Sequence, residues 1–460
     1  MSNVNLKNFV ETGYKKYSLY NLQFRSIPHL IDGLKTSQRK ILYVSMSRSK
    51  EFVKVASLAG ATIDKANYHH GNVSLEDAIS LMAKDYTGSN NIPLFLGEGN
   101  FGNIFDGTFS SARYVSVKNS PMMSKIFLKE DEPILLPSDD VENPEPLFYV
   151  PVIPWVLING IKGIAVGYAT DILSYNVIDI IKNLNCLMNN QPMNEMVPYY
   201  KGYQGQIVKD ENKWVMYGAF DKINSTTLEI TQLPISYSRE SYEEYLIKLI
   251  DKDIIKDYKN ESFGDQWKIT IKTTREFLSQ TDEKIYVDLG LKENLNENIN
   301  VIYENKVLHY DSPLDLIKDF YEIRLTFYEK RKKYILSQYV NDILKWLIRL
   351  SMNKFVKDKK QVSFKKNDII EYVLSLKDSF KKIFKDNIGI DIKNLDEIME
   401  DMVVLNIVSL RVLDITDDKI QEMNDKIKDM FSQYNDLNNL TLNDLFQKDL
   451  IEFLQNHQKG

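Results

Sequence analysis

Residues 94–116 of this chain read LFLGEGNFGNIFDGTFSSARYVS, and the rest of the sequence is best understood outward from this run. Four glycines fall among its first fourteen residues, too many for the interior of a helix or a strand. The run therefore predicts a backbone that turns sharply or approaches another group closely. It ends in the pair Arg113 and Tyr114, followed by Val115.

The pair Arg113 and Tyr114 contains a candidate nucleophile. A tyrosine hydroxyl has a free pKa near ~10, so it reacts only when a neighbouring cation or metal stabilises its anion. Arginine is permanently charged, and its planar fork binds phosphate oxygens. Taken alone, a glycine-rich loop before Arg-Tyr is more typical of a turn that leads into a strand, in a chain with 27 tyrosines.

Four other motifs give the pair a context. They are Arg25, the run DGLKTSQRKILY at residues 32–43, YHHG at residues 68–71 and NGIKGIAVG at residues 159–167. In this order and at these separations they resemble the DNA breakage-reunion core of type IIA DNA topoisomerases, the gyrase A-subunit family. Within that family the sequence is most similar to the medium subunits of T-even-type phage enzymes. The specific motifs end near residue 170, and from there onward the resemblance is architectural.

The composition is that of a folded intracellular protein. A length of 460 residues with 43% hydrophobic content suffices for two to four domains with substantial cores. The sequence has no run of about 18 uncharged apolar residues and no signal-peptide core near its N-terminus. We therefore expect a cytoplasmic protein, in the host cytoplasm if it is phage-encoded, with no membrane partner. The single cysteine, Cys186, excludes an internal disulfide and a cysteine-based zinc site.

The net charge of −6 is unevenly distributed along the chain. Residues 1–129 contain 16 Lys and Arg against 9 Asp and Glu, a net charge of +7, which leaves −13 on the remaining residues. A basic N-terminal part on an acidic body is typical of a protein with one localised nucleic-acid surface. A chance asymmetry would give the same count, so the charge supports the motifs without replacing them.

The N-terminal part predicts a winged-helix DNA-binding domain over residues 1–150. An amphipathic helix with a basic shoulder is expected from Thr36, and a helix rich in small residues over residues 53–67. A glycine-containing turn at residues 68–71 leads into another helix, and turn-rich strands follow around residues 91–117. A fold with these parts places its second helix in the DNA major groove.

Three local signals add detail to this prediction. Ser74, with Asp77 three residues later, resembles a capping box at the start of a helix. Residues 117–150 are acidic and punctuated by prolines, which indicates a domain boundary. The apolar run at residues 148–160 predicts a buried strand that ends in a turn.

The overall fold class expected is α+β and multidomain. Residues 151–311 alternate strand-like runs with helices and predict an α/β domain, which the resemblance identifies as the tower domain beside the DNA cut. From Ser312 the apolar residues keep 4-3 spacing with a shift between two runs, which predicts a long antiparallel coiled coil with one discontinuity. We expect an outgoing helix at 312–364, a helical C-gate for dimerisation at 365–425 and a returning helix at 426–460. An ordinary helical bundle fits the same C-terminal pattern equally well.

The resemblance also implies roles for individual residues. Tyr114 would attack a DNA backbone phosphate, Arg113 would stabilise the charge at phosphorus, and His70 would act near the scissile phosphate. Ile164 would wedge between base pairs and kink the duplex. The full set of DNA-binding residues that it implies is Arg25, Lys35, Arg39, Lys40, His69, Ser74 and Ile164.

Residue patterns alone support more ordinary interpretations of several of these positions. Lys35 and Arg39 lie four residues apart on one helix face, and a charged helix face is usually only solvated. His69 and His70 have no cysteine or carboxylate at ligand spacing, so they are a weak signal for a metal and we expect no metal site there. An isoleucine between glycines, as at Ile164, is more often a residue that caps a core.

The cofactors and partners follow from what the sequence lacks. It contains no Gly-x-x-x-x-Gly-Lys-[Ser/Thr] loop, and no Asp-x-Asp pair after a separate glutamate that would indicate a two-magnesium centre. We therefore expect ATP and Mg²⁺ to be bound mainly by a partner, the ATPase and metal-binding topoisomerase subunit. The resemblance adds double-stranded DNA and a second copy of the chain as partners. No DNA-wrapping propeller occurs in these 460 residues, so relaxation or decatenation is expected rather than supercoiling.

Two other functions fit part of the pattern. Tyrosine recombinases also use Arg, His and Tyr on DNA, but their tyrosine lies near the C-terminus, whereas Tyr114 lies in the first third of this chain. A non-catalytic dimeric winged-helix protein with a coiled-coil stalk would bind DNA without any covalent bond. Formation of a covalent bond to DNA is thus the property that separates the alternatives.

Overall fold

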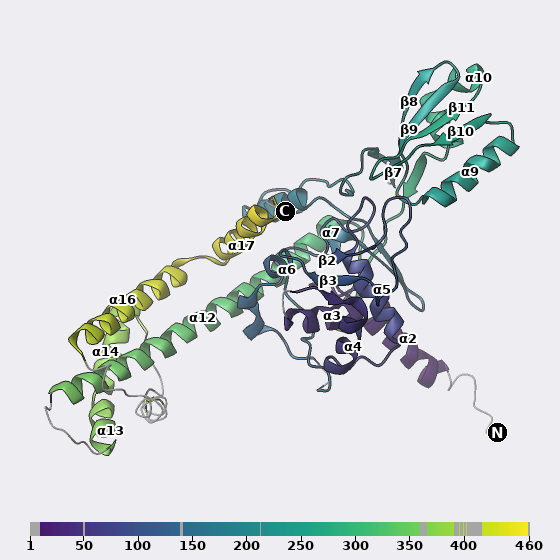
Figure 1. Cartoon of the computed structure of the whole chain (residues 1–460). Helices are drawn as coiled ribbons and strands as arrows, with labels where there is room; N and C mark the ends of the chain where they lie inside the picture. The colour runs from purple at the N-terminus through teal and green to yellow at the C-terminus, as the bar shows by residue number, and fades with distance from the viewer. Residues whose placement is uncertain are drawn as a thin grey trace, which may run out of the picture. The chain divides into compact units, whose positions relative to one another are not determined.

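The fold is described from a computed structural model of the chain, drawn in Figure 1. The structure describes residues 10–48, 51–138, 141–211, 213–358, 366–390 and 416–458, together with Leu395, Met399 and Met402. Parts of the predicted regions 1–150, 312–364, 365–425 and 426–460 therefore lie outside the described residues. The chain divides into two compact units, one comprising residues 1–324 and 447–460 and the other residues 325–446.

The N-terminal part of the first unit contains the helices α3, α4 and α5, which pack on a small sheet. Short helical segments η1, α2 and η2 lead into the turn that precedes α3. The sheet has the strand order β1-β3-β2 and is antiparallel, with Val53 paired to Val117 and Phe95 to Asn119. The elements of this part are η1 (Val10–Tyr14), α2 (Lys15–Asn21), η2 (Leu22–Ser26), α3 (Thr36–Met46), β1 (Val53–Lys54), α4 (Val55–Lys65), α5 (Asn72–Ala83), β2 (Phe95–Glu98) and β3 (Ser116–Asn119).

Helix α3 begins where the sequence predicts, and helix α5 does not. The side chain of Gln38 accepts a hydrogen bond from the Lys35 N–H at 3.0 Å, which satisfies a donor before the first turn of α3. Helix α5 starts at Asn72, with Gly71 before it, so the predicted capping box at Ser74 is wrong. The Ser74 hydroxyl instead donates back to the Gly71 carbonyl at 2.7 Å from within the first turn.

The apolar run after residue 147 is buried but is not a strand. Val152, Ile153 and Leu157 are fully buried, yet the segment is irregular until α7 (Val156–Asn159). Pro151 and Pro154 have no N–H to donate, so this run does not form a regular ladder. The prediction of burial is confirmed, and the prediction of a strand is wrong.

Two buried ion pairs hold this part together. The Asp32 carboxylate accepts from Arg39 Nε at 2.6 Å, from the Leu34 N–H at 3.0 Å and from the Tyr149 N–H at 3.1 Å. It thereby joins the turn before α3, α3 itself and the buried segment around Tyr149. Lys40, the next residue of α3, forms a second buried pair with Glu145 at 2.7 Å.

The acidic segment at residues 117–150 is only partly buried: Ile126 and Phe127 lie in the core, whereas Leu136 and Val141 are exposed. It contains α6 (Met123–Ile126) and η3 (Lys129–Ile134). Asp131 in η3 is buried and accepts from Arg324 NH2 at 2.7 Å, and the Arg324 side chain is fully buried. The acidic composition of this segment therefore supplies at least one buried anion to the fold.

The remaining part of the first unit contains four antiparallel sheets. A four-stranded sheet of order β10-β11-β9-β8 packs with α9, α10 and α11 around a core that includes Leu228, Tyr242 and Ile269; we call this part the sheet module. The elements from residue 161 to residue 310 are β4 (Ile161–Ile164), β5 (Ala169–Ile172), α8 (Val177–Met188), β6 (Gln206–Asp210), β7 (Lys213–Tyr217), β8 (Ala219–Asn224), β9 (Thr227–Gln232), α9 (Arg239–Asp251), β10 (Asp257–Asn260), β11 (Ile269–Lys272), α10 (Arg275–Leu278), α11 (Asp282–Asp288), β12 (Lys292–Leu295), β13 (Ile299–Tyr303) and β14 (Lys306–Tyr310). The predicted mixture of helices and sheets is confirmed.

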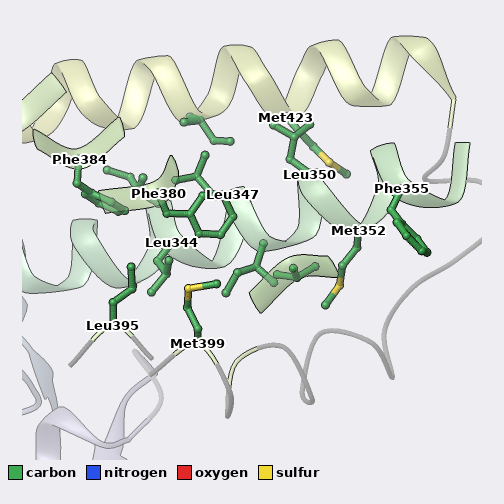
Figure 2. Close-up of a cluster of buried hydrophobic side chains, with 14 of the residues drawn as sticks. Leu344, Leu347, Leu350, Met352, Phe355, Phe380, Phe384, Leu395, Met399 and Met423 are labelled. Carbon is green, nitrogen blue, oxygen red and sulfur yellow. The ribbon is translucent and has the colours of Figure 1, made fainter. Parts of the chain in front are cut away.

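The second unit is helical. Helix α12 (Pro313–Asp358) is continuous, so the shift between its two apolar runs changes its buried face without breaking the helix. Its second part runs antiparallel to α16 (Asp417–Asn439), because Lys332 donates to the Asn438 carbonyl at 2.9 Å whereas Asn353 contacts Met423. With α13 (Lys366–Ser375) and α14 (Lys377–Ile388), these helices enclose a core that includes Leu347, Phe380 and Phe384 (Figure 2).

The returning segment consists of two helices rather than one. Helix α16 ends at Asn439, and α17 (Leu442–His457) follows after Leu440 and Thr441. The Thr441 N–H donates to the Asp444 carboxylate at 2.8 Å, and the Asp444 N–H donates to the Thr441 hydroxyl at 3.1 Å. This reciprocal capping box starts a new helix, and the motif was readable in the sequence.

Substitution of Asp32 is expected to destabilise the first unit strongly. Asp32→Asn leaves the Arg39 guanidinium buried without its counter-charge, and such a loss costs about 3–5 kcal/mol. We expect this decrease in the free energy of unfolding, measured by chemical denaturation of the full chain. Asp179→Asn, which breaks the exposed pair with Lys182, is the control and should cost less than about 1 kcal/mol. A loss of similar size in both variants would show that Asp32 does not hold the fold.

The stability of the chain is expected to fall between pH 6.5 and pH 4 because of His29. Burial lowers the pKa of His29 to about 4, with Asp32 opposing and Arg39 reinforcing the shift. Its ring stacks on Phe148 at 4.4 Å, and its Nδ1 accepts from the Ile31 N–H, as a neutral ring does. Because the unfolded chain takes up this proton first, the stability is fully present above pH 6.5 and is lost as the pH falls to about 4. The loss should be up to about 3 kcal/mol.

The difference between wild type and His29→Gln isolates this contribution, since glutamine retains a hydrogen-bond acceptor but does not titrate. Denaturation at a series of pH values should give curves that diverge between pH 4 and pH 6.5. Parallel curves would show that His29 titrates alike in the folded and unfolded chains.

Candidate functional site

Tyr114 is displayed on a turn whose two ends are fixed. Its side chain is 69% exposed, whereas Ala112 and Val115 on either side are buried. The Val55 N–H donates to the Val115 carbonyl at 3.1 Å, and the Ala56 N–H donates to the Ala112 carbonyl at 3.2 Å. The first turn of α4 therefore grips the backbone around Tyr114 and leaves its hydroxyl free to meet a ligand.

Two cations lie beside Tyr114. The Arg113 guanidinium is 5.7 Å from the centroid of the Tyr114 ring, and Lys54 Nζ donates to the Tyr114 carbonyl at 2.9 Å. A phosphate that approached the Tyr114 side chain would meet the positive charge of Arg113, and Lys54 adds positive charge at the backbone of the same turn. Lys54 was not predicted from the sequence. The pairing of β1 with β3 places it opposite Ser116, two residues after Tyr114, and that register is not readable from the sequence.

The glycine-rich run before Tyr114 is as tight as predicted. Gly99 has a φ of +107°, and a Cβ there would lie 2.9 Å from Val115 Cγ1. Gly102 has a φ of +91°, and a Cβ there would lie 2.9 Å from the backbone of Gly107. Both positions exclude a side chain, which confirms the prediction of a close backbone approach.

His70 lies in a second group of residues, at the turn after α4. Its Nε2 is 3.0 Å from the Tyr20 hydroxyl, and its ring meets Tyr68 edge-on at 5.3 Å. Burial, followed by the positive charges of Arg25 and His69, lowers the pKa of His70 below its usual value. His69 and Ser74 are exposed at this turn, and Arg25, which is exposed in η2, is close enough for its charge to act on the pKa of His70.

Ile164 projects from a hairpin that is anchored close to this second group. It ends β4 and is 86% exposed, which rules out the interpretation that it caps a core. Lys35 Nζ donates to the Lys162 carbonyl at 2.7 Å, and burial lowers the pKa of Lys35. A Cβ on Gly163 would lie 2.0 Å from the Ser26 carbonyl oxygen, so the hairpin packs directly against the residue that follows Arg25.

Arg39 and Lys40 are not at the surface. Arg39 is engaged by Asp32, and Lys40 Nζ donates to the Ala66 carbonyl at 2.6 Å in addition to its pair with Glu145. A DNA phosphate reaches neither cation while these bonds persist. The structure therefore assigns both residues to scaffolding: Lys40 holds the end of α4 from which the turn with His70 departs.

Within one chain, helix α4 separates the group around Tyr114 from the group around His70. Tyr114 lies at the N-terminal end of α4, and His70 lies beyond its C-terminal end. Helix α4 has 11 residues and is therefore about 16 Å long. In the described part of the chain, no hydrogen bond, ion pair or ring contact joins His70 to Tyr114 or Arg113. The predicted catalytic set is thus divided between two places on one chain.

The donor groups in the described residues do not fit a metal site. Nowhere in those residues do three or more His, Cys, Asp or Glu side chains gather so that they could hold a metal ion. His70 contacts the Tyr20 hydroxyl and the Tyr68 ring, which are not carboxylates or thiolates. The helices of the same part of the chain include none with the length and apolarity to cross a membrane.

Comparison with known proteins identifies relatives over nearly the whole chain. Residues 25–454 match the family of DNA gyrase and topoisomerase IV A-subunits. The chain is 32% identical over 448 residues to the mitochondrial DNA topoisomerase 2 of Dictyostelium discoideum, covering 95% of this chain and 34% of that protein. It is 30% identical over 484 residues to DNA topoisomerase 2 of Plasmodium falciparum, covering 98% of this chain and 34% of that protein.

A solved structure has the same fold. It is that of the Plasmodium falciparum topoisomerase II DNA-binding, cleavage and re-ligation domain, with a TM-score of 0.82 and 30% sequence identity. The similarity covers 98% of this chain and 65% of that one. The chain spans about a third of the length of the curated relatives that it matches. With its mixed helical and sheet fold and the match over residues 25–454, the chain belongs to the DNA gyrase/topoisomerase IV A-subunit family of type IIA topoisomerases.

Proposed function

We propose that this chain is the DNA-cleaving and religating subunit of an ATP-dependent type II DNA topoisomerase. The observation that carries the proposal is the exposed Tyr114 hydroxyl beside Arg113, on a turn that α4 holds at both ends. Membership of the gyrase A-subunit family supports it. The enzyme would make a transient double-strand break, pass a second duplex through it and reseal it.

The proposed chemistry is a phosphoryl transfer that conserves the energy of the broken bond. The Tyr114 oxygen attacks the phosphorus and loses its proton to solvent, and the bond from phosphorus to the 3′ oxygen breaks. The 3′ oxygen leaves as a hydroxyl, and the 5′ phosphate stays on Tyr114 as a phosphotyrosine. Arg113 stabilises the charge that develops on the phosphate oxygens, and fixed charges of this kind are typically a large catalytic term. Religation is the reverse reaction.

The second group of residues would hold the duplex. His69, His70 and Ser74 lie at one turn, the charge of Arg25 in η2 acts on His70, and Lys35 contacts the hairpin of Ile164. We assign backbone phosphate contacts to this turn, since cations and hydroxyls on an exposed surface bind phosphates. The exposed Ile164 would insert between base pairs and trade a few kcal/mol of unstacking for added contact. Arg39 and Lys40 contribute by holding α3 and α4 in place.

The separation of Tyr114 from His70 supports a catalytic site shared between two chains. If both residues act on one phosphate, α4 keeps them too far apart within a chain, so the His70 of one chain would serve the Tyr114 of a second. A homodimer with two such sites would cut both strands. Residues 365–425 are the proposed C-gate of that dimer, on a coiled-coil stalk formed by residues 312–364 and 426–460.

The domains, cofactors and type of reaction are proposed as the sequence predicts them. Residues 1–150 would be the winged-helix domain and residues 151–311, which include the sheet module, the tower. ATP and Mg²⁺ would be bound mainly by a partner ATPase subunit, as expected from the sequence. Relaxation or decatenation is proposed rather than supercoiling. The similarity to phage medium subunits suggests a phage-encoded protein that acts in the host cytoplasm.

The first test is covalent capture. The chain is mixed with an active type II topoisomerase ATPase subunit, magnesium and end-labelled DNA, then denatured abruptly. We expect protein joined to the 5′ end of the DNA, and no adduct with Tyr114→Phe. Tyr199→Phe, which alters another exposed tyrosine outside the turn and hairpin proposed to contact DNA, is the matched control and should leave the adduct intact.

Each other outcome of that capture has a definite meaning. An adduct that survives Tyr114→Phe would show that another tyrosine is the nucleophile. No adduct from the wild-type chain with a verified active partner would favour the non-catalytic dimeric winged-helix protein with a coiled-coil stalk.

Mixed dimers test the shared site. His70→Ala alone should slow cleavage by about 10²-fold, and Tyr114→Phe alone should abolish it. A dimer of one Tyr114→Phe chain and one His70→Ala chain would keep one intact site if the site is shared. We expect single-strand nicking at near the wild-type rate per site, measured on end-labelled DNA with purified heterodimers. Nicking at the slow His70→Ala rate would place both residues in the same chain's site.

A further inference from the structure

The tip of the glycine-rich run is inserted into the sheet module. Ile104 and Phe105 pack against the core of that module, and they lie only a few residues before Tyr114 in the sequence. The Arg239 guanidinium, at the start of α9, lies 4.4 Å from the Phe105 ring centroid, a cation–π contact. Trp267 meets the same ring edge-on at 4.8 Å.

Backbone bonds lock this insertion in place. The Arg239 N–H donates to the Phe105 carbonyl at 2.8 Å, and Arg239 NH2 donates to the Ser262 carbonyl at 2.7 Å. Arg239 therefore holds Phe105 by its ring and by its backbone at once. Phe105 itself is only partly buried, at the edge of the sheet-module core.

Short-range hydrogen bonds restrain the loop around this insertion. The Asn103 side chain accepts from the Phe105 N–H at 2.8 Å and the Asp106 N–H at 3.0 Å, and the Asn103 N–H donates to the Asp106 carbonyl at 2.8 Å. The Ser110 N–H closes the loop by donating to the Asn100 carbonyl at 3.0 Å. Such a network of short-range bonds leaves the loop few alternative conformations.

The base of the loop presses on the turn that carries Tyr114. Gly99 lies against Val115, and the Tyr114 N–H donates to the Ser111 carbonyl at 2.8 Å. A displacement of the loop tip is therefore transmitted through tied backbone to the turn that presents the hydroxyl. A misplacement of about 1 Å in a reacting group can slow a reaction about 10²-fold.

We propose that residues 99–111 form a strut through which the sheet module positions Tyr114, with Phe105 and Arg239 as positioning residues for the cleavage reaction. This inference rests on the proposed function. It makes the sheet module more than a surface for DNA beside the cut: its placement sets the geometry of the nucleophile. Neither residue touches DNA in this scheme, so both act on the cleavage step and leave duplex binding unchanged.

The test combines a structural and a kinetic measurement on Phe105→Ala. Hydrogen exchange on the full chain alone should show amides of residues 99–116 exchanging at least about tenfold faster, because their restraint is lost. In the complete enzyme, single-turnover cleavage should slow by about 10- to 100-fold. The Kd for DNA, measured in a Tyr114→Phe background that cannot cleave, should change less than about twofold. Phe105→Tyr keeps the ring and should restore both the protection and the rate.

Phe220→Ala is the matched control. Phe220 is also a partly buried phenylalanine packed on the sheet-module core, and its ring lies 5.0 Å from that of Tyr286 in α11. It should leave the exchange of residues 99–116 and the cleavage rate at wild-type values. Slower cleavage by both variants would reduce the effect to general loss of stability and overturn the strut.

The other results for Phe105→Ala also support or contradict the strut. Unchanged exchange in Phe105→Ala would show that the sheet module does not restrain the loop, and faster exchange with unchanged cleavage would show that the restraint does not position Tyr114. A fall in DNA affinity parallel to the fall in rate would make Phe105 a binding residue. If the wild-type enzyme forms no covalent adduct, the proposed function fails, and the exchange comparison still supports or overturns the restraint itself.

Discussion

The buried Asp32 carboxylate holds together segments on which the arrangement of the whole N-terminal part depends. It accepts from Arg39, from the Leu34 N–H and from the Tyr149 N–H, so the turn, α3 and the buried run share one anion. A buried charge is tolerated only when its hydrogen-bonding capacity is met, and here it is met by groups from all three segments. Gly33 allows the turn to pack closely against the segment at Val156, since a Cβ on Gly33 would lie 2.5 Å from the Val156 N.

Fixing α3 in this way fixes the residues that are proposed to face a duplex. Lys40 ties α3 to the end of α4 and so sets the turn that carries His69 and His70. Lys35, at the start of α3, ties the same helix to the hairpin of Ile164. Two lysines and one arginine of a single helix are therefore committed to internal contacts. The exposed groups that remain, including Arg25 and Ile164, project from a framework that those contacts hold rigid.

The sequence was sufficient for the parts of this arrangement that depend on local chemistry. The start of α3, the small-residue helix α4 and the tight glycine-rich run follow from residues within a few positions of one another, and the structure has all three. The Ser74 cap was wrong because Gly71 and Asn72 begin the helix earlier, a competition between neighbouring signals that composition does not resolve. The strand predicted after residue 147 was wrong because two prolines leave the run buried but without a ladder.

The candidate site was less accessible to sequence reasoning, because burial of charge is a property of tertiary contacts. Arg39 and Lys40 have the composition of a phosphate-binding face, and only the positions of Asp32 and Glu145 show that they are internal. Lys54 and Phe105 were missed for the same reason: one reaches Tyr114 through strand pairing and the other reaches the sheet module from within a loop.

The turn that carries Tyr114 would have to meet two opposing requirements. In the proposed reaction, a nucleophile that is covalently joined to DNA would move with the duplex as the break opens, yet it would have to return to the same geometry for religation. A flexible loop would meet the first demand and lose orientation, which is a major source of rate. Here the first turn of α4 is hydrogen-bonded to the backbone on both sides of Tyr114, and Gly99 of the glycine-rich loop packs against Val115. We therefore expect the tyrosine to move together with these elements. Motion of whole modules, rather than of the loop that carries the hydroxyl, is then the mode of opening that this architecture permits.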